Sequence, residues 1–425
     1  MADASLESPG PRRRAVAALL AALYAAAAWL AQHRRRDGAT ARGRGILVIG
    51  TFHNPNWSLS HLAPLAQCGL GEVCVVCDEP APPLDNVRFA CPPRWLQALL
   101  TRAGAKLCWS LLLAWRRRPD LYMGYHVFPC ALLALVLGRL FDRPACYQMT
   151  AGPLEIEGGG WQAENQLLRA LGEPCPRVER RAVAVVREFD SVVVRGSSAA
   201  AFVRALDYRR NLAIITGSVT PASRDWGDFD TRSMDIAFVG RLAECKRLDR
   251  FVNVVAAIVA ERPTTRAAVI GDGPCLAATR EQVRRLGLED SVAFLGQRSD
   301  VDALLATTKV FLLTSQSEGL SIAMLEAMTA GAVPIVADVG DLRDGLEPGR
   351  SGYLVPADDI AAYARTAIRL LTDADAWRAC SRRAVEHAAA NSSKNAIAAR
   401  WRAHLTDVLA APPAAQAASA SGSIR

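Results

Sequence analysis

The sequence lacks the paired ligands of a metal or redox site. Its 11 cysteines are scattered, and the single Cys-x-x-Cys, at Cys74 and Cys77, lies inside an apolar run that predicts a β-strand. A zinc or redox role needs a second ligand pair, and none is evident. We therefore interpret these thiols as small buried side chains in a reducing compartment, and we expect neither a metal site nor a cofactor.

The sequence also lacks internal repeats and nucleic-acid-binding motifs. Charged residues make up 22% and hydrophobic residues 51% of the 425 positions, which argues against general disorder and predicts a globular chain of two domains. The net charge is nevertheless +8, and basic residues cluster at 12–14, 34–36 and 116–118. Contact with an anionic membrane surface is the functional interpretation, and a solvated charged face is the alternative.

Residues 15–31 form a 17-residue apolar run between the first two basic clusters. At about 1.5 Å per residue, a helix of this length barely reaches across a hydrocarbon core. A cleaved signal peptide is possible, but no convincing small-residue cleavage site follows the run. We rank a membrane-associated helix, spanning or lying at the surface, above an ordinary packed helix. Arginines on both sides leave its orientation open.

Short apolar runs alternate with amphipathic stretches, which predicts open parallel sheets. The expected strands of the first half are residues 46–49, 73–77, 121–125, 145–149, 192–194 and 213–215. Those of the second half are near-continuous apolar runs at 236–239, 267–270, 292–295, 310–313 and 334–337. The expected helices include residues 59–67, 164–171, 248–260, 276–286 and 395–410.

The composition divides the chain into five segments. Residues 1–44 are an arm with the apolar helix, and 45–217 are a first α/β domain. Residues 218–392 are a second α/β domain, and the stretch at 216–233, rich in Gly, Ser, Pro and Asp, is interpreted as the hinge before it. A helix at 393–410 follows, and the Ala/Pro/Ser-rich tail at 411–425 is expected to be disordered.

Glu318 and Glu326 bracket the most informative stretch of the sequence. An apolar strand runs into a Ser/Gly turn, and a short helix is expected to open near Ser321 and to end before Pro334. A helix N-terminus offers free backbone N–H groups that suit a phosphate, whereas carboxylates accept hydrogen bonds from hydroxyl groups. A site that combines the two suits a sugar nucleotide.

The same stretch carries a family resemblance. Glu318, seven residues, Glu326 and then Ala-Met-x-Ala-Gly resemble the signature of retaining, nucleotide-sugar-dependent glycosyltransferases of group 1. Further matching blocks occur in the expected order, at residues 238–242 with Lys246, 270–274, 294–296 and 352–356. The resemblance is strong over 235–375 and looser over 45–220. It implies a GT-B fold, in which two doubly wound Rossmann-like domains are separated by a cleft, and it suggests that the last helix crosses back onto the first domain.

The resemblance also implies roles for residues of the second domain. Arg241 and Lys246 follow a predicted strand and would neutralise the nucleotide diphosphate as charge builds on the leaving group; the alternative is an exposed Arg and Lys on a loop. Glu318 would hold the donor sugar's hydroxyls and Glu326 the ribose hydroxyls.

Several neighbouring residues would complete the donor site. Backbone amides of Gly319, Leu320 and Ser321 would face the diphosphate. Gly271 and Gly273 would shape the nucleotide crevice, although a lone Gly-x-Gly is weak evidence. Arg298 would lie near the nucleobase.

The first domain is expected to hold the acceptor. His126 follows a predicted strand and matches a family histidine close to the transferred sugar, although a lone histidine is more often structural. Residues 150–152 match a loop in which many relatives carry His-Gly, and this chain lacks that histidine. The first βα loop also departs from the family: Gly50 remains of a Gly-Gly pair, and His53, Asn56 and Ser58 offer alternative donors.

Two further stretches of the sequence each allow two interpretations. Residues 95–115 read as an amphipathic helix, for which core packing and contact with a bilayer have equal weight. Asp300-Val-Asp302 resembles the Asp-x-Asp metal motif of another transferase fold, but its place at a predicted helix start favours capping.

We expect a retaining hexosyltransferase that moves a sugar from a UDP- or GDP-sugar to an acceptor hydroxyl. No carboxylate is well placed for a covalent intermediate, so front-side attack assisted by the diphosphate is the expected mechanism, without a metal. A lipid-linked or saccharide acceptor in glycolipid or envelope polysaccharide synthesis, at the cytoplasmic face of the membrane, fits the basic N-terminus. The rivals are a non-catalytic GT-B-like binding subunit, and an epimerase or phosphorylase on the same fold.

Overall fold

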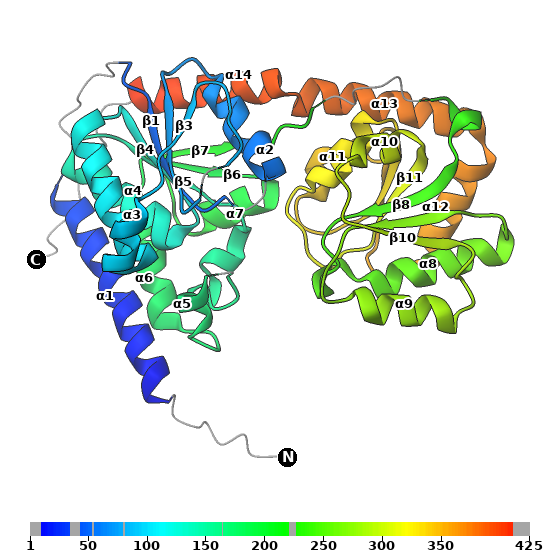
Figure 1. The fold of residues 1–425 in the computed structure, drawn as a ribbon, viewed down its shortest axis with the longest axis horizontal. Helices are drawn as coiled ribbons and strands as arrows, with labels where there is room; N and C mark the ends of the chain where they lie inside the picture. Colours follow the sequence, from blue (N-terminus) through cyan, green and yellow to red (C-terminus); the bar gives the residue numbers. More distant parts are fainter. Residues whose placement is uncertain are drawn as a thin grey trace, which may run out of the picture. The chain divides into compact units, whose positions relative to one another are not determined.

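The computed structural model describes residues 10–34, 43–52, 55–79, 81–163, 165–220 and 227–410. The chain forms two compact units. The N-terminal unit contains the chain through Arg195, Ala199–Ile215 and the chain from Ala398, and the C-terminal unit contains Gly196–Ser198 and Thr216–Ile397. The predicted tail at 411–425 lies outside the described residues. Figure 1 labels the elements of both units.

The N-terminal unit is built on a seven-stranded sheet in the order β3-β2-β1-β4-β5-β6-β7, with every pair parallel. Its strands are β1 (Ile46–Ile49), β2 (Val73–Val76), β3 (Val87–Phe89), β4 (Leu121–Tyr125), β5 (Ala145–Gln148), β6 (Ser191–Val194) and β7 (Asn211–Ile214). β1, β2, β4, β5 and β6 are buried throughout, because helices cover both faces of a parallel sheet. This burial explains why those strands appear in the sequence as continuous apolar runs, whereas the short edge strand β3 escaped prediction.

Helices form most of the connections between these parallel strands, and the first helix precedes β1. They are α1 (Pro11–His33), α2 (Pro55–Ala66), α3 (Arg94–Arg117), α4 (Leu132–Leu140), α5 (Gln166–Arg169), α6 (Pro176–Val186) and α7 (Ser197–Ala205), with short turns η1 (Val127–Ala131), η2 (Gly152–Glu155) and η3 (Glu157–Gly159). The helix expected at 164–171 shrinks to the single turn of α5, which Asn165 caps through the amides of Leu167 and Leu168.

Helix α1 packs along one side into the N-terminal unit, against α4 and α6. Leu20 and Tyr24 are fully buried in this core, and the Tyr24 ring meets Phe128 edge-on at 6.0 Å. Leu19, Leu23 and Trp29 remain exposed. Among the described residues, α1 is the one helix long and apolar enough to cross a membrane by length and composition. One face of α1 is thus that of a packed helix, the alternative that the sequence ranked second, and membrane contact stays a prediction.

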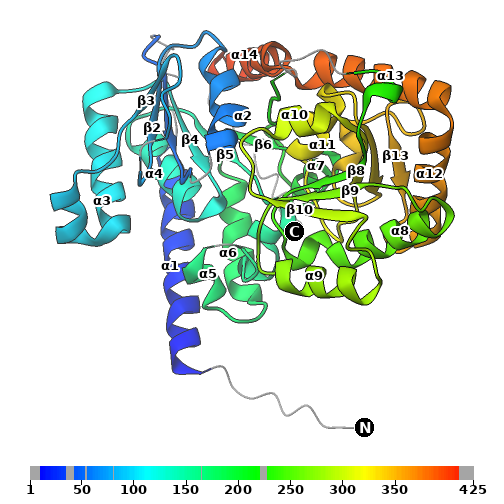
Figure 2. The same cartoon turned by 45° about the vertical axis from the view of Figure 1, so that its right-hand side comes forward.

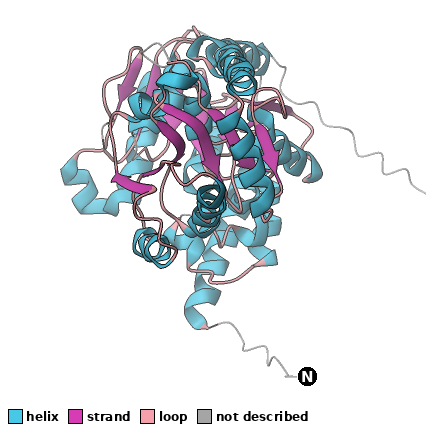
Figure 3. Cartoon of the chain, turned by 90° about the vertical axis from the view of Figure 1, so that its right-hand side faces the viewer, coloured by secondary structure: helices cyan, strands magenta, loops and turns pink. Residues whose placement is uncertain are grey.

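The C-terminal unit contains a six-stranded parallel sheet in the order β10-β9-β8-β11-β12-β13. Its strands are β8 (Met234–Val239), β9 (Ala267–Ile270), β10 (Val292–Gly296), β11 (Thr308–Leu313), β12 (Val333–Ala337) and β13 (Tyr353–Val355). The helices are α8 (Leu248–Glu261), α9 (Leu276–Arg285), α10 (Val301–Ala306), α11 (Ile322–Thr329), α12 (Ile360–Thr372) and α13 (Ala374–Ser392), with turns η4 (Phe229–Thr231), η5 (Glu244–Lys246) and η6 (Leu342–Gly345). Figure 3 colours the helices of both units cyan and their strands magenta.

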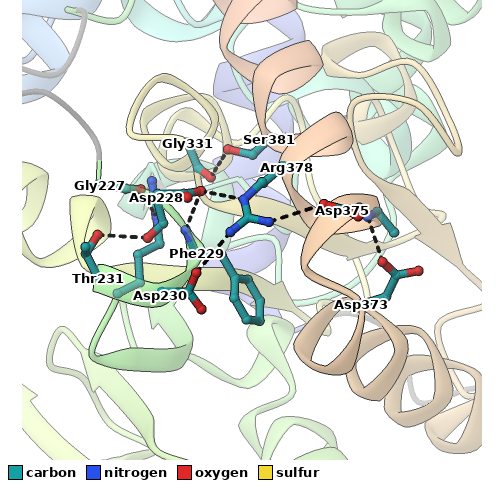
Figure 4. A network of polar contacts seen from close by, with 12 residues as sticks. Gly227, Asp228, Phe229, Asp230, Thr231, Gly331, Asp373, Asp375, Arg378 and Ser381 are labelled. Carbon is teal, nitrogen blue, oxygen red and sulfur yellow. Dashed lines mark hydrogen bonds and ion pairs between the residues drawn. The ribbon is translucent and has the colours of Figure 1, made fainter.

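The second described part of the predicted hinge, residues 227–233, is held by ion pairs within the C-terminal unit. Arg378 of α13 forms ion pairs with Asp228 (2.8 Å) and Asp230 (3.0 Å) at η4, and also with Asp375 one turn away in its own helix (Figure 4). The Asp228 carboxylate also accepts a hydrogen bond from the amide of Phe229. Residues 221–226 lie outside the described residues, so the segment expected to flex is described only at its ends.

Helix α14 (Lys394–Ala410) follows α13, and its residues from Ala398 belong to the N-terminal unit. The His404 imidazole lies 2.6 Å from the Ser191 hydroxyl at the start of β6, and Arg402 donates to the carbonyl of Cys68 at 2.8 Å. Burial lowers the pKa of His404 to about 4, so the ring is neutral near pH 7. A polar anchor of this kind holds the helix in the N-terminal unit without a buried charge.

Candidate functional site

Three polar side chains of the C-terminal unit converge where β8 and β11 end. Lys246, in η5 after β8, is ion-paired with Glu318, and the Ser315 hydroxyl donates to the same carboxylate at 2.6 Å. β8 and β11 are neighbours in the sheet, so the loops that follow them meet at its carboxyl edge, where ligands bind in such folds. Lys246 and Glu318, 72 residues apart, thus come together as the sequence predicted.

The backbone around this pair is held firmly. Gln316 donates its amide to the carbonyl of Cys245 at 2.8 Å, and the Thr314 hydroxyl donates to the carbonyl of Arg247 at 3.0 Å. The side chains themselves keep contact with solvent, 20% exposed for Lys246 and 11% for Glu318. An ion pair in a rigid loop at the edge of solvent can exchange its partners for a ligand's phosphate and hydroxyl groups at modest cost.

Glycines bring the loops of this edge together. A Cβ on Gly340, whose φ is +55°, would lie 1.7 Å from the carbonyl oxygen of Glu318, and one on Gly271 would lie 1.9 Å from that of Gly240. Leu242 donates its amide to the Asp272 carbonyl at 2.9 Å, so the loop at 271–274 supports the loop that carries Arg241. The expected part of Gly271 and Gly273 in shaping a nucleotide crevice stays a prediction, and the contact that the structure displays is with neighbouring backbone.

Arg241 and Arg298 lie on the surface of the same unit. Arg241 is exposed in the loop after β8, and its side chain has no hydrogen bond or ion pair with the described part of the chain. Arg298 pairs with Asp300 through two contacts of 2.8 and 2.6 Å, which raise the pKa of Arg298. Asp300 stands at the N-cap of α10 but does not cap it through its side chain, so the capping prediction was wrong; its carboxylate is held by Arg298 instead.

Glu326 lies on α11, with its side chain only partly accessible. Burial first, and then the nearby negative charge of Asp302, raise the pKa of Glu326 to about 7. Its carboxyl group forms no hydrogen bond or ion pair within the described residues. A desolvated carboxyl group without a partner gains from any ligand that donates hydroxyl hydrogens.

Helix α11 begins where the sequence predicted. Ser321 is its N-cap, and the Ser321 hydroxyl accepts from the amide of Met324 at 3.3 Å. Leu320 is nearly buried, whereas Gly319 is exposed. The capped amide belongs to Met324 rather than to Gly319, Leu320 or Ser321, whose expected contact with a diphosphate stays a prediction.

In the N-terminal unit, His126 directly follows β4 and adopts a positive φ of 62°. Its Nδ1 lies 3.2 Å from the Glu155 carboxylate and 2.9 Å from the Thr150 hydroxyl. A bulky residue with positive φ is strained and persists where its surroundings hold it. His126 is therefore a positioned side chain at the carboxyl edge of the sheet, as its place in the sequence indicated.

Glu155 is the residue of this region that sequence reasoning missed. It is buried in η2 after β5, and its carboxylate accepts from Tyr147 Oη (2.8 Å) and from the backbone amides of Val127 (2.9 Å), Thr150 (2.8 Å) and Ala151 (2.7 Å). Burial alone would raise the pKa of Glu155, but His126 and these donors lower it to about 2. An acidic residue shortly after a buried strand and a Gly-Pro turn was the available signal.

A pocket of about 250 Å³ opens beside this network. His126, Glu155, Thr51 and Asn165 contribute polar atoms. Its other lining residues are Tyr125, Val127, Phe128, Pro129, Cys130, Ala163 and Leu168. The mixture of apolar walls with a few polar groups is typical of a small-molecule subsite.

The structure shows what replaces the expected Gly-Gly pair in the first βα loop. The Phe52 ring packs over Gly50, where an added Cβ would lie 2.5 Å from the ring, and the Gly50 carbonyl accepts from Lys106 at 3.3 Å. Gly50 therefore faces protein atoms, and its expected ligand contact stays a prediction. The buried Ser58 hydroxyl has no hydrogen-bond partner among the described residues, whereas His53 and the side chain of Asn56 lie outside them.

Aromatic rings fill the space beside this loop. Trp57 lies 5.1 Å from Phe52, 5.0 Å from Tyr125 and 4.4 Å from His61, measured between ring centroids. The Arg195 guanidinium lies 5.5 Å from the Trp57 ring centroid. Sequence reasoning did not foresee this cluster, because its members lie on four different segments.

Comparison with known proteins places these features in a family. A family model described as glycosyl transferases group 1 matches residues 233–373. The chain is 30% identical over 308 residues to a 2-deoxystreptamine N-acetyl-D-glucosaminyltransferase of Streptomyces fradiae, covering 67% of this chain and 68% of that one. The chain belongs to the group 1 glycosyltransferases.

Two further relatives of this group 1 glycosyltransferase chain are informative. A GDP-mannose:cellobiosyl-diphosphopolyprenol alpha-mannosyltransferase of Komagataeibacter xylinus is 31% identical over 202 residues, 46% of this chain and 51% of that one. The chain thus spans about half to two thirds of the length of these curated relatives. A crystal structure of Anabaena HepE with UDP superposes with a TM-score of 0.65 at 16% identity, covering 85% of this chain and all of the other, and establishes the GT-B fold.

Proposed function

We propose that this protein is a glycosyltransferase that moves a hexose from a UDP- or GDP-sugar to an acceptor hydroxyl with retention of configuration. The observation that carries the proposal is the Lys246–Glu318–Ser315 cluster at the ends of β8 and β11. A cation suits a nucleotide diphosphate, and a carboxylate with a neighbouring hydroxyl suits the hydroxyls of a sugar. The set is complete in one unit and lies on the edge at which such sheets bind ligands.

Glu326 supports a nucleotide as the carrier of the sugar. Its carboxyl group, without a partner among the described residues, lies in the second turn of α11, and Glu318 lies in the loop before that helix. A ribose diol offers two hydrogen bonds to such a group. The relatives support either base, because HepE forms a complex with UDP and the Komagataeibacter enzyme is named for GDP-mannose.

Retention follows from a front-side attack in this proposal. The Glu318 carboxylate is ion-paired with Lys246 and accepts a hydrogen bond from Ser315, so it is poorly suited to act as a covalent nucleophile. The leaving diphosphate, stabilised by Lys246 and Arg241, then helps to deprotonate the acceptor hydroxyl on the face from which it departs. In the N-terminal unit, His126 and its pocket are the proposed place of the acceptor.

The proposed acceptor is a lipid-linked or saccharide molecule of glycolipid or envelope polysaccharide synthesis, met at the cytoplasmic face of a membrane. The relative from Komagataeibacter has a diphosphopolyprenol acceptor by its name, which supports a lipid-linked substrate. The basic clusters and the apolar outer face of α1 support a membrane location.

A donor panel with product analysis by mass tests the proposal. The full chain is incubated with UDP- and GDP-hexoses, with and without extracts of lipid-linked saccharides, and anomeric configuration is read by NMR. We expect one nucleotide to be released only when acceptor is present, together with a product heavier by one hexose. Nucleotide release that is independent of acceptor, or interconversion of donor sugars, contradicts transfer.

A non-catalytic binding subunit is the second candidate, and the Phe52 ring over Gly50 favours it, because a bulky first loop departs from the family pattern. Titration calorimetry with UDP and GDP separates the two. A chain that binds neither nucleotide supports the subunit, whereas micromolar binding of one supports the transferase.

A further inference from the structure

Helix α3 carries the most unusual surface of the N-terminal unit. It consists of two helical segments that meet at Thr101, whose φ of 63° and ψ of 165° break the helix, and Figure 2 displays the bend. Five large apolar side chains of α3 are strongly exposed, at 46–73% of their area: Trp95, Leu99, Leu107, Leu111 and Trp115. Within the second segment, Leu107, Leu111 and Trp115 recur every four residues and share one face.

The inner face of α3 packs into its own unit. Its buried residues are Ala105, Lys106, Ser110 and Ala114, which are small or polar. The Lys106 ammonium group is ion-paired with the Asp78 carboxylate at 2.7 Å. The Ser110 hydroxyl has no hydrogen-bond partner among the described residues. Trp109 and Leu113 are partly buried and pack against the core of the unit, so this face holds the helix in place. The exposed tryptophans and leucines on the other side are not used in that packing, and they point to contact with something else.

The charges of α3 identify the kind of surface that it fits. The helix contains no acidic residue, and Arg94, Arg102 and Arg116, together with Arg118 just beyond its end, are exposed without an ion pair among the described residues. A second copy of the same helix would bring arginines against arginines, which opposes pairing. An anionic lipid surface supplies the complementary charge, and tryptophans at both ends of the apolar row suit the interface between headgroups and acyl chains.

We propose that the outer face of α3, defined by Trp95, Leu99, Leu107, Leu111 and Trp115, lies in the plane of an anionic membrane. Its leucines and tryptophans enter the headgroup boundary, and the four arginines contact lipid phosphates. This inference rests on the proposed membrane location and names the element and the lipid charge responsible. α1 exposes Leu19, Leu23 and Trp29 in the same unit, so its part must be measured separately.

Vesicle co-sedimentation of the full chain tests the proposal. The probes are phosphatidylcholine vesicles with and without about one third phosphatidylglycerol, at low and at about 0.5 M salt. We expect the native chain to bind the anionic vesicles, and the double variant Leu99→Gln/Leu111→Gln and the charge variant Arg94→Glu/Arg102→Glu each to bind about tenfold more weakly. Salt should weaken the native interaction, because the arginines are solvent-exposed.

Matched controls keep the outcome specific to α3. Leu286→Gln and Arg285→Glu change exposed residues of the C-terminal unit and should leave binding unchanged. Leu19→Gln/Leu23→Gln reports on α1. Circular dichroism of each variant confirms folding, since none of the changed side chains is buried.

Three results would overturn the proposal. One is anionic vesicle binding by the α3 variants equal to that of the native chain. Another is a native chain that sediments as a dimer while the leucine variant is monomeric, which would assign the face to a second copy. The third is equal binding to neutral and anionic vesicles. Calorimetric binding of nucleotide in the absence of lipid is measured in parallel, so failure of the membrane face and failure of the transferase proposal are told apart.

Discussion

The carboxyl edges of the two sheets hold an acid–base pair each, and the pairs differ in how far they are enclosed. Lys246 and Glu318 stand at the edge of solvent with Ser315 as the other side-chain partner. Glu155 is buried and receives four backbone or tyrosine hydrogen bonds besides its contact with His126. Lys246 and Glu318 can therefore exchange their mutual contact for contacts with a ligand. The hydrogen bonds of Glu155 instead hold the protein backbone in place, and the 44% exposed His126 ring is the part of this network that solvent reaches.

Removing the solvent-edge pair should have the largest effect on activity. Lys246→Ala and Glu318→Ala each remove a group proposed to contact the diphosphate or the donor sugar, and we expect kcat/KM for transfer to fall by about 10²–10³-fold. The melting temperature should change little, because the pair is partly exposed. Arg284→Ala, which breaks the exposed pair with Glu281, is the control. Full turnover by both active-site variants would refute the site.

Removing the buried Glu155 carboxylate should lower the stability of the fold rather than slow one chemical step. Glu155→Ala leaves the amides of Val127, Thr150 and Ala151 without their acceptor, and we expect a loss of about 3 kcal/mol in the free energy of unfolding. Chemical denaturation followed by circular dichroism measures it. Glu281→Ala, on an exposed helix face, is the control and should leave the free energy of unfolding nearly unchanged. An equal, small loss in both variants would mean that the Glu155 network is not a support.

The same carboxyl group gives the N-terminal unit an acid-sensitive contact. The folded pKa of Glu155, about 2, lies below its ordinary value of 4.5. Its contribution to stability is therefore complete above pH 4.5 and is lost as the pH falls toward 2. Native chain should lose stability in this window more steeply than Glu155→Gln, measured as urea midpoints against pH. Parallel curves would contradict the depressed pKa.

Glu326 offers a smaller, pH-dependent test of the solvent-edge site. Its pKa of about 7 means that the carboxyl group is half protonated near neutrality, and ionisation should strengthen its acceptance of ribose hydroxyls. Affinity for nucleotide should therefore rise as the pH increases from 6 to 8, by about tenfold at most. Glu326→Gln should bind more weakly at pH 8 and show a flat profile. Calorimetry across this range is the measurement.

The weakest expected effect is at Arg298. The Arg298 side chain is ion-paired with Asp300 at the surface, so Arg298→Ala should change nucleotide affinity by no more than about twofold and leave the melting temperature nearly unchanged. A larger loss of affinity, with stability unchanged, would return Arg298 to the nucleobase position that the family resemblance suggests. Asp300→Ala separates the ion pair from the nucleotide contact.

Local pattern predicted much of the fold. β1, β4 and β9 occur at the expected bounds, because a buried parallel strand needs an unbroken apolar run and is bounded by turns. The edge strands β3 and β13 have three residues each with intermediate burial, so their patterns were too short and too mixed to stand out. The family was predictable for a related reason. Its motifs, such as the stretch from Glu318 to Glu326, are short continuous segments that can be recognised without knowing which strands are neighbours.

The sequence by itself determined the α/β class, the chain of βα units, the cap at Ser321 and the identity of the charged residues after β8 and β11. Only the tertiary structure decided which partners those charges meet. The tertiary structure paired Arg298 with Asp300 and enclosed Glu155 among amides from two segments, one after β4 and one after β5. It also packed one face of α1 and left the leucines of α3 exposed. Periodicity along a chain records which residues tend to be buried, whereas contacts between segments far apart depend on how strands are ordered in the sheet, and no local pattern encodes that order.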